Sequence, residues 1–183
     1  LFRFGGIFLS SWKPVAIGGK LENPMSVTYL KEKLRKKGPR LVLTPELEKE
    51  LKKKIESDPV IKNMYQAIRL NAQTITQKPL LERVLEGRRL LAVSREMLYR
   101  INMLGMTYRI EKDKAILNRI NEEVLAICNF IDWNPSHYLD VAEMSLAIAL
   151  AIDWAGEDLP KTTVSIAKNA LIEKGIKPSY NKA

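Results

Sequence analysis

The sequence predicts an all-α chain of antiparallel helical hairpins, and three observations lead to that prediction. Apolar residues recur at helical spacing in one segment after another from residue 39 onward. Two of these segments open with a capping residue followed by proline, Thr44-Pro45 and Asp58-Pro59, which is the usual start of a helix. No stretch alternates convincingly between apolar and polar residues with a period of two, as a half-buried strand would. Short connections between consecutive helices make them antiparallel neighbours.

Residues 1–38 differ from the rest of the chain and are expected to form an irregular N-terminal segment, or the remnant of a leader. Leu1 to Pro24 is rich in glycine and aromatic residues, and Arg3 precedes an apolar run too short for a clear signal peptide, with no small-residue cleavage site after it. Lys31 to Lys37 is a basic cluster that we interpret as a solvated helix end, with a polyanion patch as the alternative. Residues 39–183 are expected to form the helical domain.

The first two helices of that domain begin at the cap-plus-proline signals. The helix after Thr44 has one narrow apolar stripe, and lysines cover its other faces. The helix after Asp58 has a broader apolar face and is interrupted at Lys78-Pro79. The two sets of apolar residues are Leu47, Leu51 and Ile55, and then Val60, Ile61, Met64, Tyr65 and Ile68. The stretch from Leu80 to Val93 contains Gly87-Arg88-Arg89, so a short helix and a loop both remain open there.

Three further helices surround the most apolar segment of the chain. Ser94 is expected to start one, Asp113 caps another that runs to about Asn129, and Pro160 begins the last, which Gly175 ends. The inward residues of the first are Met97, Leu98, Ile101, Leu104 and Tyr108. Cys128, the only cysteine, falls in the helix after Asp113 and is expected to be a buried structural thiol, so the chain has no internal disulfide and no thiolate metal site.

The chain is organised around the helix that follows the loop at residues 130–137. One apolar stripe consists of Val141, Met144, Ile148 and Ile152, and a second consists of Leu139, Leu146 and Leu150. A helix that is apolar on two faces is normally sandwiched between other helices, so the loop before it would lie at the rim of the assembly. Glu143 lies among the leucines and is expected to pair with a cation of a neighbouring helix. The candidate cations are Arg95, Arg100 and Arg109.

Composition favours some classes of partner over others. A net charge of +9 and an isoelectric point near 9.6 favour polyanions. The basic residues are spread over several helix faces without interleaved aromatics, which argues against nucleic acid. No apolar run approaches about 18 residues, so no membrane span is expected. No phosphate loop, metal-ligand spacing or Ser/His/Asp arrangement is visible, and we therefore expect no cofactor, no metal site and no self-contained set of catalytic residues.

Two motifs carry a resemblance to a known family. Pro39-Arg40-Leu41-Val42-Leu43, a Lys/Glu-rich helix and then Asp58-Pro59 resemble the N-terminal opening of the heparinase II/III-like polysaccharide lyases. Trp133-Asn134-Pro135-Ser136-His137-Tyr138-Leu139-Asp140-Val141-Ala142-Glu143-Met144, closing with Ala151-Ile152-Asp153-Trp154, is similar to a helix of the same family's toroid. The resemblance covers roughly residues 39 to 180, with the two motifs in the right order.

The resemblance implies an enzyme that cleaves acidic, uronic-acid-containing glycosaminoglycans such as heparin and heparan sulfate by β-elimination. Amide or cationic donors neutralise the uronic carboxylate, a Tyr or His removes the α-proton, and an acid protonates the departing oxygen. In the complete family form, a helical toroid is followed by a large β-sandwich and the cleft lies between them. The resemblance also implies an acidic polysaccharide as partner and a periplasmic or secreted location.

The same resemblance implies that this chain lacks the principal catalytic residues, because the family's catalytic Asn or His and Tyr lie beyond the matched stretch. A closed toroid needs about a dozen helices at ordinary helix and loop lengths, and fewer are predicted before Ala183. We therefore expect the N-terminal half of an incomplete (α/α) toroid, a fragment inactive alone. Its expected partners are the missing C-terminal toroid and β-sandwich portions, and its exposed apolar faces favour self-association.

Four residues near the rim are predicted to contact substrate: Trp133, Asn134, His137 and Tyr138. A tryptophan can support a sugar ring and an asparagine can bind a carboxylate, although a packing Trp and a capping Asn are equally open. His137 is the only histidine, and a half-buried structural role is its alternative. Tyr138 lies about 100° round the helix from it, so the two do not form an acid–base pair on one face. The alternative function is a helical-hairpin protein-interaction module without enzymatic activity.

Overall fold

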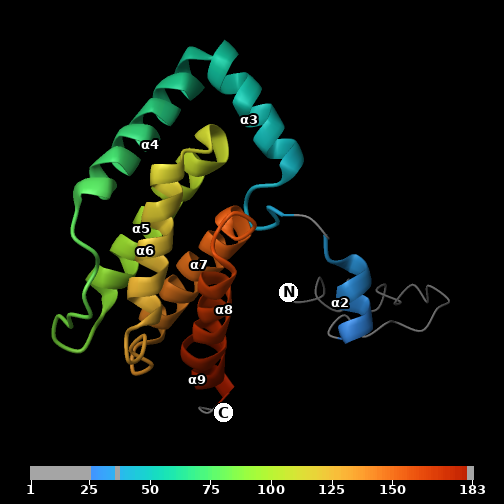
Figure 1. Cartoon of the computed structure of the whole chain (residues 1–183). Helices are drawn as coiled ribbons and strands as arrows, with labels where there is room; N and C mark the ends of the chain where they lie inside the picture. Colours follow the sequence, from blue (N-terminus) through green and yellow to red (C-terminus); the bar gives the residue numbers. More distant parts are fainter. Residues whose placement is uncertain (1–25, 36–37, 181–183) are drawn as a thin grey trace, which may run out of the picture. The chain divides into compact units, whose positions relative to one another are not determined.

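The computed structural model of the protein describes residues 26–35 and 38–180 (Figure 1). The chain divides into two compact units, Leu1–Lys36 and Lys37–Ala183. In the first unit, helix α2 (Val27–Lys33) begins at Ser26, whose Oγ accepts a hydrogen bond from the Tyr29 amide at 3.1 Å. The rest of the predicted irregular segment, including the leader-like stretch, lies outside the described residues.

The second unit is a succession of helices joined by short connections. In chain order they are α3 (Pro45–Ser57), α4 (Pro59–Gln77), α5 (Leu91–Glu111), α6 (Lys114–Cys128), α7 (Tyr138–Ala155), α8 (Lys161–Ala170), the π-helical turn η1 (Leu171–Ile176) and α9 (Lys177–Tyr180). Residues 26–35 and 38–180 contain no strand, only an isolated bridge at Glu86 and Arg89. The predicted all-α class is confirmed. Within these residues, no helix combines the length and the apolar character needed to cross a membrane.

The helix starts follow the capping signals of the sequence. Thr44 Oγ1 accepts from the Leu47 amide at 3.3 Å, and Asp58 Oδ1 accepts from the Val60 amide at 2.8 Å. Asp113 caps α6 in the same way. Each such cap satisfies an amide that has no partner inside the helix and stabilises the helix by about 0.5–2 kcal/mol.

Helix α5 lies at the centre of the packing. It contacts α3, α4, α6 and α7, and its interface with α7 is the most extensive of the fold. Figure 1 shows α4, in green, running along the bundle that contains α5 and α6. The fully buried core residues include Met97, Ile101, Leu104, Ile120, Ile127, Met144 and Ile148. Burying each of these side chains contributes about 1.5–3 kcal/mol, so this core holds the helices together.

Two helix ends differ from the prediction. Helix α5 begins at Leu91 and not at Ser94, because the Ser94 hydroxyl bonds to the Leu91 carbonyl and to Glu143 and does not cap the helix. Gly175 does not end the last helix, since the chain continues through η1 into α9. A Cβ at Gly175 would lie 2.6 Å from Ser145 Oγ, so the glycine serves close packing against α7.

The apolar faces of α4 and α7 are also only partly as predicted. On α4 the buried residues are Tyr65, Ala72 and Ile75, whereas Val60 and Met64 are exposed. On α7 the first predicted stripe packs inward, as Val141, Met144 and Ile148 are buried and Ile152 is half-buried. In the second stripe only Leu150 is buried, and Leu139 and Leu146 remain 46% and 45% exposed. Helix α7 is therefore covered on one broad face and not sandwiched on two.

The end of α7 binds the segment before α3. Asp153 Oδ2 accepts hydrogen bonds from the amides of Arg40 and Leu41, at 2.5 and 2.8 Å. Trp154 Nε1 donates to the Leu41 carbonyl at 3.0 Å. The Trp154 ring also lies against α5, where a Cβ at Gly105 would come within 2.8 Å of it. These contacts fix the entry to α3 against the two central helices.

Candidate functional site

Trp133 is a packing residue in this structure. Its side chain is completely buried, and its Nε1 donates to the Ile127 carbonyl at 3.2 Å. Its ring lies near Gly175, where an added Cβ would be 3.4 Å away. A sugar ring needs an exposed aromatic face for stacking. Of the two interpretations of Trp133, the structure shows the packing one.

Asn134 and Asp140 form a buried polar network at the start of α7. Asn134 has a φ of +58°, a left-handed conformation that asparagine tolerates better than most residues. Its Nδ2 donates to the Arg88 carbonyl at 2.9 Å and to Asp140 Oδ2 at 2.7 Å, and its Oδ1 accepts from Ser136. Asp140 Oδ2 also accepts the Leu90 amide at 2.7 Å. The Asn134 amide therefore binds the protein itself and holds the loop before α5 against α7.

The ionised state of Asp140 is favoured by this network. Burial alone would raise the pKa of the Asp140 carboxyl, but hydrogen bonds from the Leu90 amide, Asn134 and His137 outweigh burial and lower that pKa below its ordinary value. A charged carboxylate thus remains at the base of the site, where it can orient the neighbouring imidazole.

His137 is oriented by Asp140 and remains accessible. Its Nδ1 lies 2.9 Å from Asp140 Oδ1, and 30% of its side chain is exposed. Because a carboxylate only accepts hydrogen bonds, the contact places a proton on Nδ1. Nε2 has no partner within residues 26–35 and 38–180, so it can accept a proton or, on protonation, donate a hydrogen bond to a ligand. Tyr138, the first residue of α7, is 38% exposed.

The turn at Glu86–Arg89 brings two arginines to this site that sequence reasoning did not place there. The turn is closed by backbone hydrogen bonds between Glu86 and Arg89, and Gly87 supplies the positive φ of +62° that it requires. The side chains of Arg88 and Arg89 are exposed and have no hydrogen bond or ion pair to the described part of the chain. The Gly-Arg-Arg sequence was the only local signal, and it did not indicate which helix end it would approach.

The predicted ion pair of Glu143 is confirmed. Glu143 accepts from Ser94 Oγ at 2.6 Å and from Arg95 Nε at 3.3 Å. The other two candidate cations have different partners: Arg109 binds Glu48, and Arg100 binds Glu123 at 2.8 Å. Arg100 and Arg119 share one carboxylate oxygen of Glu123, which is fully buried. Sequence reasoning missed this buried cluster of three charged side chains.

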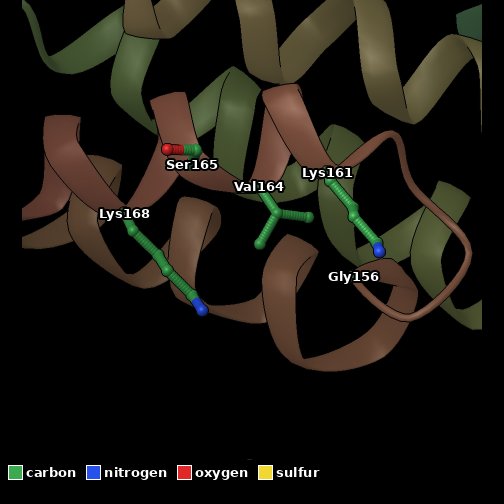
Figure 2. A pocket seen from close by; sticks show the side chains of 5 residues that line it. All are labelled: Gly156, Lys161, Val164, Ser165 and Lys168. Atoms are coloured by element: carbon green, nitrogen blue, oxygen red, sulfur yellow. The ribbon is translucent and has the colours of Figure 1, made fainter.

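A recess of about 330 Å³ lies beside α8, away from the start of α7 (Figure 2). It is lined by Gly156, Lys161, Val164, Ser165 and Lys168. Figure 2 shows the two lysines and Val164 extending from the same side of α8, with Val164 between them. Sequence reasoning missed this recess, although the seven-residue spacing of the two lysines was a visible signal.

The described residues offer little for metal or thiol chemistry. Residues 26–35 and 38–180 hold no cluster of three histidine, cysteine or acidic side chains suited to a metal ion. Cys128 is buried, as predicted, and burial raises the pKa of its thiol to about 11, with Lys174 acting weakly in the opposite direction. It is therefore a protonated thiol at neutral pH and a poor nucleophile.

The sequence matches no protein-family model, and it has no significant match among curated proteins. The family resemblance therefore stands on the two quoted motifs alone.

Proposed function

We propose that this chain forms the N-terminal part of a helical toroid in a polysaccharide lyase of the heparinase II/III-like type. In this proposal it binds acidic, uronic-acid-containing polysaccharides at the start of α7, in the periplasm or outside the cell, and does not cleave them alone. One observation carries the proposal: Asn134 and Asp140 hold the Arg88-Arg89 turn against the helix end that bears the only histidine.

The chemistry of the site suits a uronate polymer. Two unpaired guanidinium groups can neutralise carboxylate or sulfate groups, and arginine binds such planar or multi-oxygen anions through paired N–H donors. His137 and the backbone of the arginine turn are both tied to Asp140, the turn through the Leu90 amide, and His137 Nε2 remains available as a proton acceptor or a hydrogen-bond donor. Elimination also needs an acid to protonate the departing oxygen. We assign no residue to that step, and the proposal therefore predicts binding without turnover.

Contact between the two family motifs supports the proposed toroid. The opening motif supplies Arg40 and Leu41, and the end of the α7 motif supplies Asp153 and Trp154. These contacts would explain why the two motifs occur in the same chain, because their residues bind one another. The net charge of +9 supports a polyanionic partner.

A protein-interaction module without enzymatic activity is the second candidate function. The observation in its favour is the exposed pair Leu139 and Leu146, which lie two turns apart on α7 and could enter an apolar groove of another protein. Saccharide binding by a Leu139→Ser, Leu146→Ser variant separates the two candidates. The lyase-type proposal predicts that this variant still binds uronate oligosaccharides, whereas the module predicts no preference for them and a loss of protein association in the variant.

The proposed function is tested by binding and turnover together. We would measure the affinity of the chain for heparan sulfate and alginate oligosaccharides, neutral dextran, and duplex DNA at equal, physiological ionic strength. We expect uronate oligosaccharides to bind more tightly than DNA of equal charge, with no rise in the absorbance of unsaturated uronate. An Arg88→Gln, Arg89→Gln variant should bind them about three- to thirty-fold more weakly, as expected for two exposed charge contacts.

A matched control removes two positive charges elsewhere. Lys49 and Lys53 on α3 are exposed and have no side-chain partner in the described chain, so Lys49→Gln, Lys53→Gln should leave most of the affinity intact. Equal affinity for DNA and uronate oligosaccharides would contradict the proposal, as would equal losses in the two double variants.

A further inference from the structure

The recess beside α8 has the composition of a site for an anionic ligand. Lys161 and Lys168 are both exposed, and neither makes an ion pair or hydrogen bond within residues 26–35 and 38–180. Most lysines that line a protein surface point separately into solvent, but these two flank one hollow, as Figure 2 shows. Two ammonium groups on either side of a hollow attract anions more strongly than one does.

The dimensions of the recess fit a short saccharide better than a single small ion. Seven residues separate the two lysines along α8, which places their Cα atoms about 10 Å apart. That separation allows each ammonium group to contact a different anionic group of a short sugar chain, and the volume of about 330 Å³ exceeds what a single small ion fills. Val164 forms an aliphatic floor between the lysines, and Gly156 leaves room at the edge because it has no side chain.

A single-stranded nucleic acid fits the recess less well. Proteins bind single-stranded nucleic acids by stacking bases on aromatic side chains, and none of the five lining residues is aromatic. Glu157, next to Gly156, is the nearest acid in the sequence and reduces the positive charge at one edge. The local balance still favours an anion, since two lysines line the hollow and no acid does.

We propose that the recess between α8 and the end of α7 is a second binding site for an acidic saccharide, in which Lys161 and Lys168 each contact one sulfate or carboxylate group. The choice of saccharide rests on the proposed function. The site itself is separate from the start of α7, because the 18 residues of α7 span about 27 Å.

Amide chemical shifts of the whole chain, titrated with a sulfated heparin tetrasaccharide, test this proposal. We expect amides of residues 156–168 to shift, and Lys161→Gln, Lys168→Gln to abolish those shifts and weaken binding at this site about three- to thirty-fold. The Lys49→Gln, Lys53→Gln variant should keep them. Both pairs are exposed, so neither change should unfold the protein.

The outcomes separate this site from the one at α7. Shifts at residues 86–90 without shifts at 156–168 would overturn the second site and leave the proposed function standing. Shifts at 156–168 alone, lost in the Lys161→Gln, Lys168→Gln variant, would support the second site and contradict the proposed one. If duplex DNA moves the recess amides as strongly as the tetrasaccharide does, the recess is a general polyanion site and the saccharide proposal is wrong.

Discussion

Replacing Asp140 should destabilise the fold and change the tautomer of the His137 imidazole. Asp140 is fully buried and accepts hydrogen bonds from the Leu90 amide, Asn134 and His137. Asp140→Ala leaves the first two donors buried without an acceptor, at about 1–3 kcal/mol each, and removes a charge-assisted bond. We expect a loss of about 3–6 kcal/mol in the free energy of unfolding, measured by urea denaturation.

Asp140→Asn is the matched, isosteric variant. An amide oxygen can still accept from Leu90 and Asn134, while the amide nitrogen faces His137 and requires the other imidazole tautomer. We therefore expect a smaller loss, about 1–3 kcal/mol, because only the charge assistance is lost. The tautomer change should appear in the nitrogen chemical shifts of His137. A cost below about 1 kcal/mol for Asp140→Ala, or equal costs for the two variants, would refute the network described here.

The advantage of wild type over Asp140→Asn should depend on pH. The pKa of the Asp140 carboxyl is lower in the folded protein than its ordinary value of 3.8. The stability that the carboxylate contributes is therefore fully present above the unfolded-state pKa. It is lost as the pH falls through the folded-state pKa, when the folded protein takes up the proton. Unfolding curves of the two proteins should converge in acid and separate above about pH 5.

Three further predictions concern the core. Gly105→Ala places a Cβ 2.8 Å from the Trp154 ring. We expect it to lower the free energy of unfolding by about 1–3 kcal/mol in thermal unfolding and to shift the tryptophan emission. Unchanged emission and stability would mean that the helices are not packed this closely. Glu123→Ala leaves two buried arginines without their shared acceptor and should cost about 3–5 kcal/mol, whereas a cost near zero would show that water already reaches them. Cys128 should react with a maleimide far more slowly than a free thiol at neutral pH, and only urea should restore the rate; fast labelling of the native protein would contradict its burial.

The sequence predicted the helices well where local signals agree. Thr44 and Asp58 cap the helices that they were expected to cap, because the capping residue, the proline and the apolar period act within one turn. Ser94 misled the prediction for the opposite reason. Its hydroxyl has a tertiary partner, Glu143, so a residue that resembles a helix cap lies inside α5.

The site could be predicted only in part, because its contacts join segments far apart in the chain. The loop before α7 was predicted to present Trp133 at the rim, but Trp133 is buried, and its burial depends on Ile127 and on packing near Gly175, which no local pattern reveals. The Asn134 hydrogen bond to the Arg88 carbonyl spans 46 residues. The exposed side of α7 was missed because periodicity shows which residues are apolar and not how many neighbours the helix has.

Hydrogen–deuterium exchange with a heparan sulfate oligosaccharide should reveal whether an acidic saccharide binds at the start of α7. We expect slower exchange at residues 86–90 and 134–140 on addition of the oligosaccharide, and loss of that protection in the Arg88→Gln, Arg89→Gln variant. Protection confined to the lysine-rich surface of α3, or none anywhere in residues 38–180, would contradict it.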